Sequence, residues 1–123
     1  MRALEIARHI AHCVKTLGQP GVGFYGDGAR RVESVGLGTG MICNPLEFVG
    51  LQPDMYVVIN DAIQTWTQGE FSHDTGLPMV VIDHGVSEEF GIKALHDHLA
   101  TVFPQIEVVH FQQGCSYQWI TSP

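Results

Sequence analysis

Two uninterrupted apolar runs constrain the fold of this 123-residue chain more than any other feature. Residues 55–59 (MYVVI) and 79–83 (MVVID) lack the alternation of polar and apolar side chains expected of a strand with one face in water. Continuous apolar strands are typical of parallel sheets that helices cover on both faces. The chain is therefore predicted to adopt a three-layer α/β/α fold with a mostly parallel sheet.

Apolar residues at helical spacing and turn residues between them place the other elements. A glycine-rich segment at 21–26 (GVGFYG) matches the dinucleotide-binding pattern in letters only, because it follows a helix and precedes a strand. We therefore predict a mobile loop there. Helices are predicted at 4–17, from 44 onward, at 62–73 and at 87–102, the last capped by Ser87; further strands are predicted at 31–37 and 106–111, giving about four strands.

Composition narrows the class of protein. The 45% apolar and 15% charged residues indicate one globular domain spanning 1–123. Thirteen acidic against six basic residues give a charge of −7, which disfavours nucleic acid as a partner. No run approaches the roughly 20 apolar residues of a membrane span. Three cysteines without a CxxC pair indicate reduced thiols, so we expect a cytoplasmic protein.

Polar or small residues follow each of the four predicted strands. Gly38-Thr39-Gly40 follows the first, Asn60-Asp61 the second, Asp83-His84 the third and Gln112-Gln113-Gly114-Cys115 the fourth. Ligands of open α/β sheets bind beyond the carboxyl ends of the strands. We therefore expect these groups to share one edge of the sheet, where the backbone N–H groups of Gly38, Thr39 and Gly40 suit an anion.

His84 and Glu88 carry the strongest chemical signal at this edge. An imidazole from a strand end and a carboxylate from the following helix start form half of a metal or acid/base site. Asp83 is expected to accept the other ring N–H of His84, with the alternative that alternation along the strand turns its side chain away. Asp61 is expected to bind metal or act as a general base. The residues alone leave a local alternative, in which Glu88 favours the helix start and Asp61 forms a turn.

These segments resemble the carboxyl-terminal half of the Nif-three-like family. The similarity runs from the first helix through VESVGLGTG at 32–40 and PDMYVVIND at 53–61, then through GLP at 76–78 to the His84-x-x-x-Glu88 motif. Family members are about twice this length, and their other metal ligands lie in an amino-terminal half without a counterpart here. Where they have a Thr-Gly-acidic sequence, this chain has Ile59-Asn60-Asp61.

The resemblance implies a Nif-three-like fold, a homo-oligomer and a site for iron or zinc, with one or two ions. The resemblance also implies that His84 and Glu88 are metal ligands. The missing ligands would be supplied by another subunit or an amino-terminal half. Family members are regarded as metal-dependent hydrolases similar to type-two GTP cyclohydrolase, so a small-molecule substrate is expected. The alternative is a non-catalytic assembly or binding module that retains the fold with an incomplete metal site.

Overall fold

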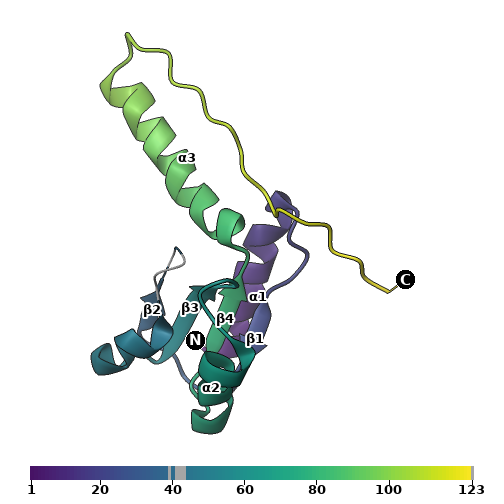
Figure 1. The fold of residues 1–123 in the computed structure, drawn as a ribbon. Helices are drawn as coiled ribbons and strands as arrows, with labels where there is room; N and C mark the ends of the chain where they lie inside the picture. Colours follow the sequence, from purple (N-terminus) through teal and green to yellow (C-terminus); the bar gives the residue numbers. More distant parts are fainter. Residues whose placement is uncertain (39, 41–43, 123) are drawn as a thin grey trace.

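A four-stranded mixed sheet organises the chain in the computed structural model, which describes residues 1–38, 40 and 44–122 (Figure 1). The strand order is β1-β4-β3-β2. The central strands β3 (Met55–Ile59) and β4 (Met79–Ile82) are parallel, β2 (Val35–Leu37) is parallel to β3, and β1 (Gly23–Tyr25) is antiparallel to β4. The predicted α/β class with a mostly parallel sheet is confirmed.

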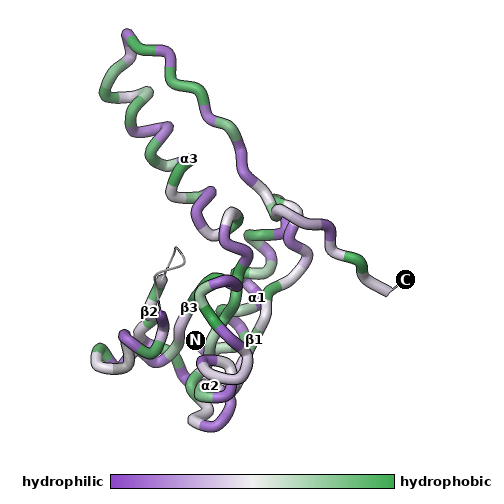
Figure 2. The backbone as a smooth tube through the Cα atoms, in the orientation of Figure 1, coloured by the Kyte–Doolittle hydropathy of each residue, from purple (hydrophilic) through white to green (hydrophobic). Residues whose placement is uncertain are grey.

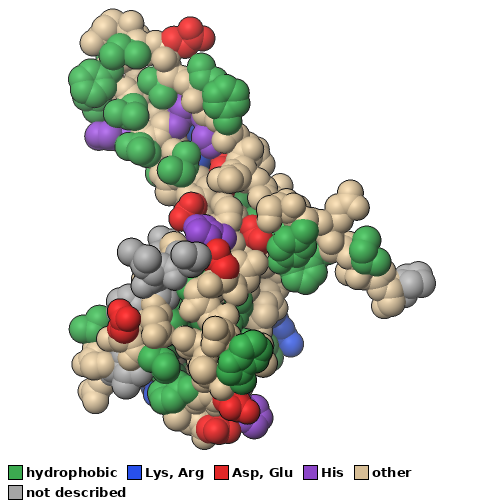
Figure 3. All heavy atoms as spheres, in the orientation of Figure 1, with side chains coloured by type: hydrophobic (Ala, Val, Ile, Leu, Met, Phe, Trp, Pro, Cys, Tyr) green, Lys and Arg blue, Asp and Glu red, His purple; other side chains and the backbone are tan. Residues whose placement is uncertain are grey.

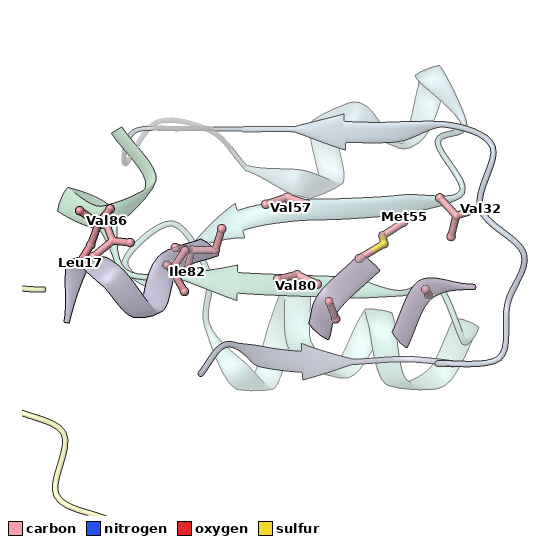
Figure 4. Packing of buried hydrophobic residues seen from close by; sticks show 10 residues of the cluster. Leu17, Val32, Met55, Val57, Val80, Ile82 and Val86 are labelled. Carbon is pink, nitrogen blue, oxygen red and sulfur yellow. The ribbon is translucent and has the colours of Figure 1, made fainter. Parts of the chain in front are cut away.

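Elements on both faces of the sheet produce the three layers. Helix α1 (Ala3–Val14) packs on one face, where Val57 and Val80 join the larger apolar cluster (Figure 4). Tyr56, Val58 and Met79 face the opposite way and form a second cluster with residues that flank the short helix α2 (Glu70–Thr75). Because successive side chains of a strand point to opposite faces, burial on both sides explains the uninterrupted apolar runs.

The fourth strand is not the predicted one. Residues 106–111 belong to no strand; they return alongside the long helix α3 (His84–Val102), outside the sheet (Figure 1). Nineteen helical residues span about 28 Å, which carries the chain far from the sheet before this segment begins. The edge position is taken by β1, in the segment predicted to be a mobile loop. Gly23 permits this pairing, since a Cβ there would lie 3.1 Å from Cβ of Val81.

Helix boundaries also differ from those predicted. The first helix is α1 followed by a 3-10 turn at Lys15–Leu17, and the helix predicted from 44 onward is a 3-10 helix, η2 (Pro45–Leu51). The helix predicted at 62–73 is a π-helical turn, η3 (Thr65–Gly69), followed by α2. Helix α3 begins at His84 because Asp83, rather than Ser87, is its N-cap: a side-chain oxygen of Asp83 accepts the Val86 N–H.

Candidate functional site

The ends of β3 and β4 bring Asp61 and His84 together. The sheet hydrogen bonds continue one step past β3, where the N–H of Asn60 donates to the carbonyl of Ile82 at 2.8 Å. This alignment places Asp61 beside the first residue of α3, and Nδ1 of His84 lies 2.8 Å from Oδ2 of Asp61. The expected convergence at the carboxyl edge of the sheet is therefore present for these two residues.

Glu88 reaches the other side of the same imidazole. It follows His84 by four residues, one helical turn, so both side chains lie on one face of α3. Nε2 of His84 is 3.1 Å from Oε1 of Glu88, and both side chains are partly exposed. The imidazole is thus held between two carboxylates, where α3 joins the sheet and Figure 3 shows acidic and histidine side chains together.

Hydrogen bonds among Asn60, Asp83 and Gln19 fix the backbone beneath His84. Oδ1 of Asn60 accepts the His84 N–H at 3.2 Å, and its amide donates to Oδ2 of Asp83 at 3.3 Å. The N–H of Asp83 donates to Oε1 of Gln19 at 3.1 Å, and both side chains are buried. Sequence reasoning missed Gln19, whose position in a loop after α1 carries no motif. Sequence reasoning named Asn60 only together with Asp61, as the two residues that follow a predicted strand.

The two carboxylates alter the titration of His84. The hydrogen bond with Asp61 raises the pKa of the imidazole above its ordinary value, and the bond with Glu88 acts in the same direction. Partial desolvation opposes them and lowers the pKa. The two carboxylate contacts therefore favour the protonated form of the His84 ring relative to its neutral form.

The same geometry fits two ligands of a metal ion. Metal–ligand bonds of about 2.1 Å meeting at about 90–110° separate the ligand atoms by roughly 3.0–3.4 Å. Nε2 of His84 and Oε1 of Glu88 are 3.1 Å apart, within that range. Among the described residues, however, no group of three or more His, Cys, Asp or Glu side chains is arranged to hold an ion. The pair can supply part of a coordination shell, not all of it.

Asp83 and Gly38 lie in surroundings other than those predicted. The carboxylate of Asp83 contacts Asn60 and the helix start rather than the imidazole, and Asp61 is at the ring nitrogen where Asp83 was expected. The N–H of Gly38 donates to the carbonyl of Val57 at 3.0 Å, so it does not face an anion. Gly40 has a φ of +80°, and Thr39 lies outside the described residues.

The carboxyl-terminal segment adds a tyrosine that sequence reasoning also missed. Partial burial raises the pKa of the Tyr117 phenol, and the nearby side chain of Asn60 acts in the opposite direction. Nearby, Nε1 of Trp119 donates to Sγ of Cys115 at 3.3 Å. The tail after α3 thus returns to the site from a distant part of the sequence.

The fold and the site define a three-layer α/β/α protein with a His–carboxylate cluster at the carboxyl ends of its parallel strands. Two of the matching solved structures are crystal structures of Staphylococcus aureus protein SA1388, described in one case as a hypothetical protein. They are 19% and 20% identical to this chain, with TM-scores of 0.73 and 0.72. No family model and no curated protein sequence matches the chain.

The likeness to protein SA1388 extends over nearly the whole of this chain but not over the whole of that protein. Each alignment covers 98% of this chain and 34% of the solved chain. The two proteins therefore share a fold over this region, and this chain spans about a third of the length of the structures that it matches.

Proposed function

We propose that the chain is a metal-dependent hydrolase-like domain that supplies a His/Glu half-site to a metal centre of one or two ions. The observation that carries the proposal is the pairing of Nε2 of His84 with Oε1 of Glu88, 3.1 Å apart and partly exposed. An ordinary helix-surface ion pair would not need the Asn60–Asp83 hydrogen bonds that fix the backbone of His84. A bound divalent ion, iron or zinc, would supply Lewis-acid chemistry for hydrolysis of a small molecule.

Asp61 is assigned a positioning role in this proposal. A histidine that ligates metal through one nitrogen commonly donates its other N–H to a carboxylate, which fixes the ring and its tautomer. Asp61 occupies that place at Nδ1 of His84, 2.8 Å away. This assignment changes the predicted catalytic role of Asp61, since a carboxylate engaged with the ring is less available as a general base.

Another polypeptide must complete such a centre, because three or four protein ligands are usual. The shared fold extends over only 34% of protein SA1388, which is consistent with further protein around this region. The missing ligands would come from an amino-terminal half or from another subunit. The same proposal includes membership of the Nif-three-like family, a similarity to type-two GTP cyclohydrolase and a cytoplasmic location.

Metal content tests the half-site directly. The chain is purified without chelator, and bound iron and zinc are measured per chain by elemental analysis, followed by titration of the metal-free protein with zinc. We expect binding that His84→Ala and Glu88→Gln each weaken about 10-fold or more, because each substitution removes one of two ligands.

His73→Ala is the matched control. This exposed histidine also contacts a carboxylate, Asp74, but it lies on α2 and has no second carboxylate within reach in the described contacts. Its loss should leave zinc affinity unchanged. Metal binding that is absent, or equally insensitive to all three substitutions, would contradict the proposed half-site.

A second candidate function is a non-catalytic assembly module. It is favoured by the apolar side chains that remain exposed on α3 and on the segment after it. Under this proposal the His84 site is a remnant, and the chain acts through its contacts with other subunits. Metal-free protein that forms defined oligomers would favour this second function over the first.

A further inference from the structure

A surface cleft lies at the end of the sheet opposite His84. It has a volume of about 330 Å³ and is lined by Arg30, Gln52, Pro53, Tyr56 and Leu77. Pro53 and Leu77 come just before β3 and β4, so the cleft is at the amino ends of these parallel strands. Figure 2 shows α3, with its recurring apolar residues, extending from the other end of the sheet. The five residues of β3, about 17 Å long, therefore separate the cleft from the candidate metal site.

Tyr56 brings a hydroxyl group without a partner to this cleft. The residue is only 3% exposed, and its hydroxyl oxygen is buried with no hydrogen-bond partner among the described residues. A Cβ on Gly36 would lie 3.0 Å from Cδ1 of Tyr56, so the missing side chain leaves room for the ring over β2. Burial raises the pKa of the phenol, which therefore keeps its proton and can donate a hydrogen bond. Buried polar groups are nearly always hydrogen-bonded, so this hydroxyl requires an acceptor from outside the described chain.

Arg30 supplies a positive charge at the same cleft. Its side chain is half-buried, and its guanidinium makes no hydrogen bond or ion pair with any residue that the structure describes. Backbone hydrogen bonds, that of Glu33 foremost, lower the pKa of the nearby Asp54 carboxyl, and the Arg30 charge has a smaller effect in the same direction. Asp54 thus has donors of its own, which leaves the guanidinium free to form paired hydrogen bonds with a ligand carboxylate.

Gln52 is the third polar residue of the cleft, and its backbone is strained. Its φ is +50°, and among the described residues it is the only one other than glycine with a positive φ. Residues with a Cβ rarely adopt this conformation, because the Cβ crowds the following carbonyl oxygen. Strained positions of this kind cluster at ligand-binding and active sites. The conformation of Gln52 therefore agrees with a binding role for the cleft, to which it adds a side-chain amide.

We propose that this cleft binds a small organic carboxylate. One carboxylate oxygen accepts hydrogen bonds from the Arg30 guanidinium and the other accepts from the Tyr56 hydroxyl, which the cleft opens slightly to expose. The apolar body of the ligand lies against Pro53 and Leu77. The volume is at the lower end of the roughly 300–1,000 Å³ of small-molecule sites, which favours a ligand the size of one ring with its acid group. The proposal goes beyond the proposed function and does not require the metal.

Titration of the isotope-labelled chain with benzoate, followed by protein NMR, tests the cleft. We expect saturable shifts of amides that border it, and a Kd that Arg30→Gln raises about 10-fold or more because charge-assisted hydrogen bonds are lost. Tyr56→Phe should raise the Kd about 3-fold or more. Without ligand, the same variant should be at least as stable as the wild type in urea unfolding, because its hydroxyl has no partner to lose. A hydroxyl with a structural role would instead make Tyr56→Phe less stable.

Arg31→Gln is the matched control, because Arg31 is the next residue but pairs with Glu33 at 2.9 Å and does not line the cleft. It should leave the Kd for benzoate unchanged. His84→Ala should also bind benzoate normally while losing metal, which separates this proposal from the half-site. The absence of saturable binding, binding that survives Arg30→Gln or Tyr56→Phe unchanged, or equally tight binding of benzyl alcohol or inorganic phosphate would each overturn the proposal.

Discussion

At the scale of single residues, His84 is the only described imidazole that lies between two carboxylates from different elements. Asp61 contacts Nδ1 and Glu88 contacts Nε2, so both ring nitrogens have an acceptor when the ring is protonated. A metal ion and a proton would compete for Nε2, because a ligating histidine must be neutral there. Metal affinity should accordingly fall as the pH is lowered through the pKa of His84.

The contribution of Asp61 can be measured in the metal-free protein. Asp61→Asn removes the largest cause of the raised pKa, so the pKa of His84 should fall towards its ordinary value. Since the folded-state pKa is raised, the imidazolium stabilises the wild-type fold at pH below the unfolded-state value, and this contribution is lost as the pH rises through the folded-state pKa. Histidine ring signals followed by NMR during a pH titration give the pKa in both proteins.

Asp74→Asn is the control for this experiment, because Asp74 contacts the exposed His73 rather than His84. It should leave the His84 titration unchanged. An unchanged pKa of His84 in Asp61→Asn would show that the carboxylate does not hold the ring in solution as it does in the structure.

At the scale of elements, the start of α3 sets the geometry of the site. The buried carboxylate of Asp83 accepts the Val86 N–H at 3.4 Å and the Asn60 amide at 3.3 Å, so it joins the helix start to the end of β3. Ser87, the cap predicted from the sequence, instead donates its hydroxyl to the carbonyl of His84 at 2.7 Å. The helix therefore begins three residues earlier than the sequence indicated.

These two residues give opposite expectations for stability. Asp83→Ala should lower the free energy of unfolding by about 1–2 kcal/mol, because it removes a helix cap and takes away the acceptor of the Asn60 amide. Ser87→Ala should cost less than about 0.5 kcal/mol, as expected for a partly exposed hydroxyl that is not a cap. Urea unfolding of both variants makes the comparison, and equal losses would contradict the assignment of Asp83 as the cap.

Local sequence signals located the central strands and the site pair, but not the sheet edge. The runs at 55–59 and 79–82 and the spacing of His84 and Glu88 depend on neighbours in the sequence, which a pattern can represent. Residues 106–111 have a strand-like composition, yet the length of α3 carries them away from the sheet. Gly23 pairs because it fits against Val81, and Gln19 reaches Asp83 across the fold. Such long-range contacts leave no local pattern.

At the scale of the whole molecule, the chain consists of a packed body and a protrusion. The body contains the sheet with α1 and α2, and the protrusion contains most of α3 with the returning segment (Figure 1). Polar contacts join the two near the base of α3, where Oε2 of the buried Glu89 accepts the Gln113 N–H at 2.8 Å. The Cys115 N–H donates to the carbonyl of Leu17 at 3.0 Å. Among the described residues, no helix is both long enough and apolar enough to cross a membrane.

This division predicts a gradient of hydrogen exchange along the chain. Amides of β3 and β4 should exchange slowest because both faces of these strands are buried, whereas those of residues 92–111 should exchange fastest. Mass spectrometry of peptides resolves both regions. Equal protection of the body and the protrusion would contradict this division of the chain.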